Sequence, residues 1–184
     1  MRLIVSLLLL AAAPMMVSCD RQKAEEPQAP AAAEEAKGVD RSHRGEPAPT
    51  VKFRNPDGGE FDLSKFRGTP VLVNLWASWC APCIKELPTL QQLEQAQAKD
   101  GKLGVIAVSQ DMAPQGSVEA FLGERDIGRF AAFHDDQMGL SSALGVQILP
   151  TTILYDAQGK EVWRYVGDLD WTGDEANKLL SELK

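Results

Sequence analysis

The sequence predicts an α/β domain with a parallel core of strands covered by helices. Residues 69–76 (TPVLVNLW) and residues 103–111 (LGVIAVSQD) are nearly continuous β-branched and apolar runs, as expected of strands buried on both faces. A helical pattern separates them, because large apolar residues recur every three positions from Ile84 to Leu93. Strands and helices then continue to alternate, and this alternation favours a parallel core.

Length and composition indicate a single domain. The chain has 184 residues, 44% of them hydrophobic, which is enough for one substantial core and too little for two. The formal net charge is -7, and no cluster of Lys and Arg alternates with aromatic residues, so we expect no nucleic-acid partner. The acidic composition and the single core make a monomer the default expectation.

Residues 1–18 have the layout of an export signal. Arg2 precedes an apolar run that is shorter than the ~20 residues that a transmembrane helix needs. The run ends in MVSC, which resembles the lipobox of bacterial lipoproteins, although its first residue is not the preferred leucine. We therefore expect lipidation of Cys19, with a soluble secreted form or an uncleaved anchor as alternatives. Asp20 resembles the inner-membrane retention signal of enteric lipoproteins, which implies a periplasm-facing protein held at the inner membrane.

The next segment changes composition to Ala, Glu, Pro, Gln and Lys, with few large apolar side chains. Such a segment cannot bury enough surface to offset its chain entropy. We expect residues 19–46 to be a disordered tether and residues 47–184 to form the folded domain. His43 lies in the predicted tether, and we expect no role for it.

The folded part opens with a predicted hairpin, because Asn55-Pro56-Asp57-Gly58 has the Pro and Gly placement of a tight turn between two short strands. After the first buried strand comes the periodic helix. Its start carries a cysteine pair, Pro88 should kink its second turn, and it should end at Asp100-Gly101.

The elements expected after the second buried strand rest on similar local signals. In order, they are a helix opened by Ser117, a third strand over residues 130–136, a short helix closed by Gly145, an antiparallel hairpin over residues 151–167 and a final helix over residues 174–183. Thr172 followed three residues later by Glu175 is a capping-box pattern for that final helix.

The pair Cys80 and Cys83 allows three interpretations. Structural zinc requires four Cys or His ligands, and the remaining candidates are Cys19, His43 and His134, the last expected near a strand end at the surface. A structural disulfide that closes so short a loop gains little chain entropy. A redox-active pair is the favoured interpretation, because the pair stands at a helix start.

A helix start suits thiol chemistry. Its unpaired N–H groups and its dipole favour a negative charge and therefore stabilise the thiolate of Cys80, which is the attacking species. Cys83, about one turn further along, should be less exposed and should resolve the mixed disulfide that Cys80 forms. Pro82 occupies an early helical position, where a missing N–H costs little.

Two motifs together carry a family resemblance. VLVNLWASWCAPCIKELP, followed about seventy residues later by LPTTILYDAQGKEV, resembles the thioredoxin superfamily and, within it, the TlpA-like periplasmic thiol–disulfide oxidoreductases. The resemblance spans residues 47–184. It implies a thioredoxin-like fold with a central mixed sheet flanked by helices, an N-terminal hairpin and an αβ insertion around residues 103–133.

The resemblance also implies roles for single residues. Cys80 is the nucleophile, Cys83 the resolving cysteine and Pro150 a cis-proline that faces them, so that the backbone of Leu149 can pair with an extended substrate peptide. The substrate-binding surface is expected to comprise Trp79, Ala81, Pro82, Leu149, Pro150 and Thr151. Trp76 and Trp79 either shield the disulfide from water or pack at its rim.

One departure from ordinary thioredoxin concerns the acid beside the cysteines. Thioredoxin keeps a buried Asp six residues before the first cysteine, where this chain has Asn74, which cannot accept a proton. Glu86 matches the Glu of the TlpA-like CxxExP pattern and is expected to take that part. The alternative is a solvated carboxylate on the helix surface.

The sequence therefore predicts a thiol–disulfide oxidoreductase. The resemblance to the TlpA-like proteins implies that it reduces protein disulfides, with client proteins in cytochrome c or copper-site maturation, whereas Ala81-Pro82 between the cysteines does not fix the direction. The resemblance implies electrons from a membrane thiol reductase, and we expect no metal and no cofactor beyond the cysteine pair. Two alternatives stay open: a copper-handling module that binds Cu(I) through the pair, and a peroxidase.

Overall fold

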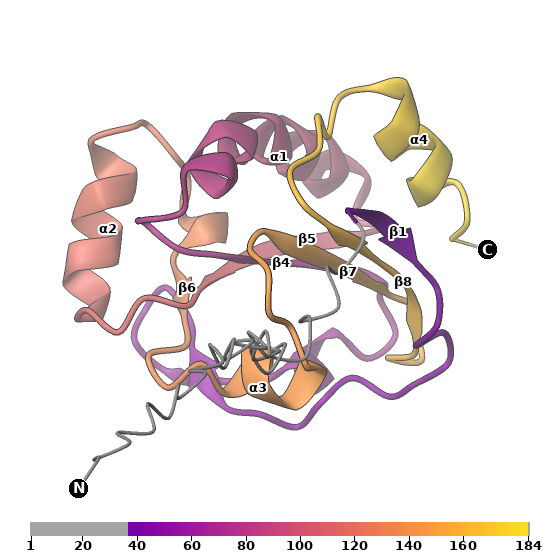
Figure 1. Ribbon diagram of the computed structural model, residues 1–184, viewed down its shortest axis with the longest axis horizontal. Coiled ribbons are helices and arrows are strands. Elements are labelled where there is room, and N and C mark those ends of the chain that lie inside the picture. Colours follow the sequence, from indigo (N-terminus) through magenta and orange to yellow (C-terminus); the bar gives the residue numbers. More distant parts are fainter. Residues whose placement is uncertain (1–36, 184) are drawn as a thin grey trace, which may run out of the picture. The chain divides into compact units, whose positions relative to one another are not determined.

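The computed structural model describes residues 37–183, and its centre is an eight-stranded mixed sheet (Figure 1). The strands are β1 (Gly38–Asp40), β2 (Phe53–Arg54), β3 (Glu60–Phe61), β4 (Val71–Trp76), β5 (Gly104–Ser109), β6 (Phe133–His134), β7 (Thr151–Tyr155) and β8 (Glu161–Val166). They lie in the order β1-β8-β7-β4-β5-β6-β2-β3. β5 is parallel to β4 and to β6, and the other pairs are antiparallel, so the expected mixed sheet with a parallel centre is confirmed.

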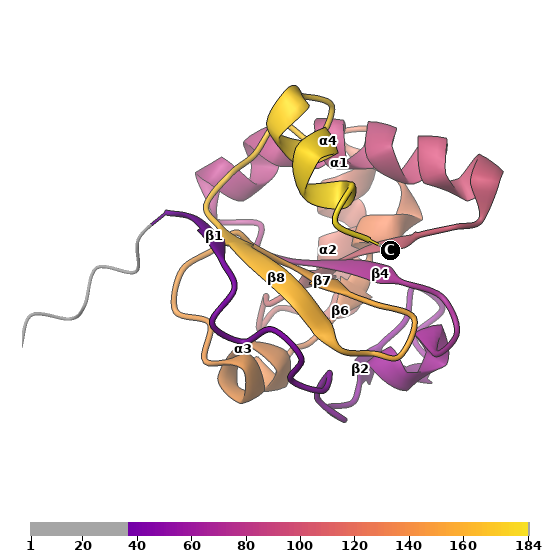
Figure 2. The same cartoon turned by 90° about the vertical axis from the view of Figure 1, so that its right-hand side faces the viewer.

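Helices cover both faces of this sheet (Figures 1 and 2). They are α1 (Ala81–Asp100), α2 (Gln115–Gly123), α3 (Gly139–Leu144) and α4 (Asp174–Leu180), with two short 3-10 turns, η1 (Leu63–Phe66) and η2 (Arg129–Ala131). α1, α2 and α4 pack on one face, and η1 and α3 pack on the other, together with side chains of β2 and β3. Within residues 37–183, no helix combines the length and the apolar character that a membrane crossing requires.

Side chains that alternate along β4 build the two layers of the core. Leu72 and Trp76 belong to the cluster that contains the buried face of α1. Val73 and Leu75 point to the opposite face and pack with Leu140 of α3. Because both faces of β4 are covered, its sequence is apolar at every position except Asn74, in line with the nearly continuous apolar run in the sequence.

The parallel strands end together along one edge of the sheet, the edge formed by their carboxyl ends. Trp76 pairs with Ser109 and Ser109 pairs with His134, so the carboxyl ends of β4, β5 and β6 are in register. The loops that follow these ends are therefore neighbours, although their residues lie far apart in the sequence. The cysteine pair follows β4 and lies at this edge.

α1 begins and ends where the sequence predicted. Cys80 is its N-cap, and Pro88 lies within it as expected. It ends at Gly101, which has the left-handed φ of 62° that glycine adopts readily. Its leucines are buried against the sheet, so the three-residue spacing marks the packed face.

The folded domain begins earlier than predicted. Gly38–Asp40, assigned to the tether from composition, forms β1, which pairs with β8 at the edge of the sheet. His43, also assigned to the tether, has its Nδ1 atom 3.0 Å from the carboxylate of Glu46. A sheet edge offers unpaired N–H and C=O groups, so a short polar segment can become a strand by pairing with it. The predicted boundary at residue 47 is therefore wrong.

Thr172 and Glu175 do not form the predicted capping box. The N-cap of α4 is Gly173, which has no side chain to accept a hydrogen bond, and the Thr172 hydroxyl donates instead to Asp170 at 2.6 Å. α4 ends at Leu180, short of the predicted end at residue 183.

The observed bounds of two other elements also differ from the predicted ones. α2 begins at Gln115, after Pro114, and not at Ser117. The third strand is only Phe133–His134, because residues 129–131 form the 3-10 turn η2. Gly145 ends α3 with a φ of 65°, as predicted.

Candidate active site

The two cysteines have different environments within one disulfide. Cys80 and Cys83 are bonded, with their Cα atoms 5.3 Å apart. Cys80, the N-cap of α1, is 6% exposed, whereas Cys83 is fully buried. The Sγ atom of Cys80 accepts a hydrogen bond of 3.3 Å from the backbone N–H of Cys83. Cys80 therefore lies closer to solvent, beside the helix N–H groups that favour a thiolate.

Pro82 lies within the first two positions of α1, as predicted. The proline ring suits this position because the first N–H groups of a helix have no partner within the helix. Ala81 and Pro82 are both exposed, so they border the disulfide on the solvent side.

Glu86 is buried, and the alternative of a solvated helix carboxylate is wrong. Its side chain accepts hydrogen bonds from Asn74 Nδ2 at 2.7 Å, from the backbone N–H of Leu169 at 3.1 Å and from Trp171 Nε1 at 3.2 Å. Only 2% of the residue is exposed. Cys83 and Glu86 are three residues apart on α1 and share its buried face.

Burial changes the titration of this carboxylate. Desolvation raises the pKa of Glu86 from its ordinary 4.5 to about 7, although the hydrogen bonds from Leu169, Asn74 and Trp171 oppose the rise. The negative charge of Asp168 adds to it. A carboxyl group that titrates near neutral pH can both accept and release a proton under physiological conditions.

The loop before β7 contains the expected cis peptide bond between Leu149 and Pro150. Leu149 is half-buried, and its backbone makes no hydrogen bond to another backbone group within residues 37–183. Thr151 was predicted to bind substrate, but its side chain is buried and its hydroxyl donates to the carbonyl of Ile148 at 2.7 Å. Thr151 therefore supports the loop from within.

The two tryptophans near the disulfide have opposite environments. Trp79 is 70% exposed, whereas Trp76 is fully buried and donates from Nε1 to the carbonyl of Ala131. Met112, after β5, is 78% exposed. Nothing local in the sequence distinguishes Met112. It directly follows Asp111, whose carboxylate bonds Ser78 in the loop before Cys80.

His134 does not lie at the surface, as the sequence analysis expected. It is 1% exposed at the end of β6, and its Nε2 atom is 2.8 Å from the carbonyl oxygen of Asp111. Within residues 37–183, no group of three or more His, Cys, Asp and Glu side chains has the arrangement of a metal site.

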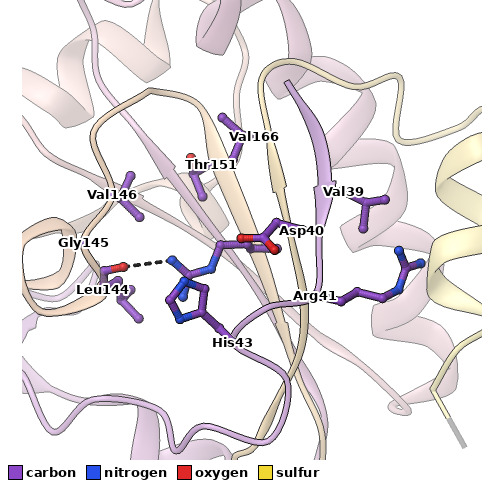
Figure 3. Close-up of a pocket in the computed structure, with 10 residues that line it drawn as sticks. Val39, Asp40, Arg41, His43, Leu144, Gly145, Val146, Thr151 and Val166 are labelled. Atoms are coloured by element: carbon purple, nitrogen blue, oxygen red, sulfur yellow. Dashed lines mark hydrogen bonds between the residues drawn. The ribbon is translucent and has the colours of Figure 1, made fainter. Parts of the chain in front are cut away.

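A cavity of about 380 Å³, whose lining does not include the cysteine pair, lies between β1 and the chain after it, the end of α3 and strands β7 and β8 (Figure 3). Its polar side chains are engaged with neighbouring groups. Arg164 donates to Glu161 and to the carbonyl of Leu144, each at 2.8 Å, and Asp40 accepts from Ser42. Thr151 is the one predicted site residue among those that line it.

Comparison with known proteins agrees with this geometry. Residues 43–180 match the Redoxin family. The chain is 30% identical over 122 residues to the thioredoxin-like protein YneN of Bacillus subtilis, in a match that covers 62% of this chain and 66% of YneN, just under two thirds of that relative. It is 36% identical over 140 residues to the thiol-disulfide oxidoreductase ResA of Geobacillus kaustophilus, covering 76% of this chain and 78% of ResA.

The fold is also similar to a solved structure. A Chlorobium tepidum protein assigned as the thiol:disulfide interchange protein DsbE superposes with a TM-score of 0.65 and 29% identity, covering 77% of this chain and 98% of that one. The chain therefore belongs to the Redoxin family and, within the thioredoxin superfamily, to the TlpA-like thiol–disulfide oxidoreductases.

Proposed function

We propose that this protein reduces disulfide bonds of other proteins in the bacterial cell envelope. The observation that carries the proposal is the unequal environment of the cysteines: Cys80 is at the helix N-terminus near solvent, and Cys83 is buried on the same helix face as Glu86. The sulfur of Cys80 is thus suited to attack a disulfide of a client protein, that is, of a protein substrate. The sulfur of Cys83 is suited to complete the reaction inside the domain.

The reaction begins with both cysteines reduced. The Cys80 thiolate attacks one sulfur of the client disulfide, forms a mixed disulfide and expels the other client sulfur as a thiolate. Cys83 then loses its proton to Glu86 and attacks the Sγ atom of Cys80. The second client thiolate leaves, and the Cys80–Cys83 disulfide forms. Two electrons have passed to the client, and an external dithiol, which we take to be a membrane thiol reductase, returns them.

The client surface in this proposal surrounds Cys80. Exposed Trp79 and Met112 provide apolar contact, and Ala81 and Pro82 complete the rim. The backbone of Leu149, next to Pro150, is free to pair with an extended client segment. Such a surface recognises a polypeptide chain more than a particular sequence. Cytochrome c precursors and copper-site proteins are the two client classes that we propose.

The N-terminal predictions remain part of the proposal. The signal peptide over residues 1–18, the lipid on Cys19 and the site of Asp20 lie outside the described residues. The sequence MVSC supports a lipid anchor, and Asp20 supports retention at the inner membrane, facing the periplasm. The acidic composition and the single core support a monomer. Mass spectrometry of protein from a bacterial host should find acyl chains on Cys19, and Cys19→Ala should release the domain. An unmodified wild-type Cys19 would contradict the anchor.

The redox proposal is tested with purified reduced protein and insulin as a disulfide client, dithiothreitol being the electron source. Wild type should accelerate insulin reduction, and Cys80→Ser should not. The same preparation is titrated with Cu(I) and assayed with hydrogen peroxide. Stoichiometric Cu(I) binding or peroxide turnover without insulin reduction would favour the copper-handling module or the peroxidase instead. No cofactor beyond the cysteine pair is required for the proposed activity.

A further inference from the structure

The turn that presents Cys80 is held by a side chain from the loop that follows β5. The backbone N–H of Cys80 donates to the carbonyl of Ala77 at 3.1 Å, so residues 77–80 form a turn between β4 and α1. Ser78 is at the first corner of this turn. Its backbone N–H and its hydroxyl both donate to the carboxylate of Asp111, at 3.0 and 2.7 Å.

Asp111 is itself held by residues at the ends of β5 and β6. It follows β5, is 4% exposed and accepts a further hydrogen bond of 2.6 Å from the hydroxyl of Ser109. Its backbone N–H donates to the Ser109 hydroxyl, and its carbonyl lies 2.8 Å from His134 Nε2 on β6. The carboxylate therefore ties the turn before Cys80 to the end of β5, and the backbone carbonyl of Asp111 lies against His134 at the end of β6.

We propose that Asp111 is a positioning residue for the nucleophile: it fixes the turn at residues 77–80 so that Cys80 stays at the N-terminus of α1, where its thiolate is stabilised. The inference rests on the thiol chemistry proposed above and adds a residue to it. Asp111 acts through Ser78, whose two donors both end on the same carboxylate.

The charge of Asp111 and its positioning role have opposite effects on the Cys80 thiolate. A nearby negative charge disfavours a second one, so the field of the carboxylate alone would destabilise the Cys80 thiolate. Neutralising Asp111 should then speed the reaction of Cys80 if only the charge matters. It should slow the reaction if the turn geometry matters more. The two explanations therefore differ in sign.

Asp135 provides a matched control. It follows β6, is 2% exposed and accepts backbone N–H bonds from Gly139 at 3.1 Å and Leu140 at 2.7 Å. It is thus a buried carboxylate that bonds backbone groups at the same edge of the sheet, but it holds α3. Asp135→Asn should cost stability in the way that Asp111→Asn does, because each leaves buried donors without a carboxylate partner, but it does not touch the turn before Cys80.

The experiment measures how fast iodoacetamide alkylates Cys80 in the reduced full-length protein between pH 5 and 9, with peptide mapping to identify the modified cysteine. The variants are Asp111→Asn, Ser78→Ala, Ser78→Thr and Asp135→Asn. We expect Asp111→Asn and Ser78→Ala to slow alkylation at pH 7 about threefold or more, which corresponds to about half a unit in the thiol titration. Ser78→Thr, which keeps the hydroxyl, and Asp135→Asn should react like wild type.

Ser78→Ala keeps the carboxylate and its charge, so it reports on positioning even if Asp111→Asn fails to fold. Faster alkylation of Asp111→Asn would show that the charge dominates and would overturn the proposal. Unchanged rates in both Asp111→Asn and Ser78→Ala would also overturn it. Alkylation needs no client protein, so these outcomes are separate from whether the protein reduces disulfides in the cell.

Discussion

Asn74 on β4 donates a hydrogen bond of 2.7 Å to Glu86 on α1, within the buried layer that holds Cys83. The same amide group donates to the hydroxyl of Thr152 on β7 at 2.9 Å. The strand position where thioredoxin carries an acid therefore carries a donor here, and the acid is on the helix. The pair keeps a carboxyl group near the cysteines, with its orientation fixed from the sheet.

Glu86→Gln should slow disulfide reduction at pH 7 by on the order of 100-fold, the usual scale for loss of a general base. The fold should tolerate the change, because Asn74 Oδ1, which has no hydrogen-bond partner within residues 37–183, can turn to accept from the new amide. Stopped-flow reduction of insulin from pH 5 to 9 provides the measurement. Wild type should show a titration near 7, the pKa of Glu86, that the variant lacks.

Glu94→Gln is the control for that experiment, because Glu94 is on the same helix and only partly buried. It should keep the wild-type rate and pH profile. If Glu86→Gln retained the wild-type profile, Glu86 would be a structural residue and the proton would need another acceptor.

Glu86 should also make stability depend on pH. Its pKa is about 7 in the folded protein and 4.5 when unfolded, so the native state binds more protons between these values. Its contribution to stability is therefore fully present below pH 4.5 and is lost as the pH rises through 7. The loss should be about 3 kcal/mol at about 1.4 kcal/mol per pKa unit. Urea unfolding of the oxidised protein should show a weaker decline over this range in Glu86→Gln, and parallel wild-type and variant curves would contradict the raised pKa.

Cys83→Ser should trap client proteins. Without the resolving thiol, the mixed disulfide on Cys80 persists, so covalent adducts that dithiothreitol dissolves should accumulate in the native host. Cys80→Ser should give few adducts, because Cys83 is buried. Mass spectrometry of the adducts would identify the client class. Equal adduct levels in the two variants would refute the division of roles.

Trp79→Ala and Met112→Ala should weaken client binding without changing the thiol chemistry. Each removes a large apolar side chain from the proposed client surface, and loss of one such contact raises KM by about tenfold at a hot spot. Insulin reduction should show the rise in KM, whereas reduction of the Cys80–Cys83 disulfide by dithiothreitol should keep its wild-type rate. Val39→Ala is the control, since Val39 is 38% exposed on β1 at the edge of the sheet. An unchanged KM in both variants would remove this surface from the proposal.

The elements that the sequence predicted correctly are those with strong local signals. The leucines of α1 and Gly101 at its end mark a helix whose packing agrees with its periodicity. β1 was missed because its three residues have no strand pattern of their own and are ordered by pairing with β8. The predicted capping box failed because Thr172 bonds the nearby Asp170 instead. Strand pairing and side-chain hydrogen bonds of this kind depend on contacts that a local sequence pattern does not contain.

The site residues also fall into those that the sequence identifies and those that only the structure identifies. Cys80, Cys83 and Pro150 are recognisable because their motifs are local and specific. The burial of Glu86 depends on Trp171 and Leu169, which are more than eighty residues away in the sequence. The bond between Ser78 and Asp111 crosses from one strand end to the next and has no sequence signature. Charged and polar groups whose partners come from distant segments are therefore the part of the site that needed the structure.

The register of β1 determines where the N-terminal chain leaves the domain. Leu75, Thr151, Val166 and Gly38 form one continuous row across four strands. Three strand spacings separate Leu75 from Gly38, about 14 Å, so the chain departs from the edge that carries the disulfide. With the proposed lipid on Cys19, the 19 residue steps to Gly38 reach at most about 65 Å. The exit point of the chain would then lie within about 65 Å of the membrane, on the side of the domain that carries the disulfide.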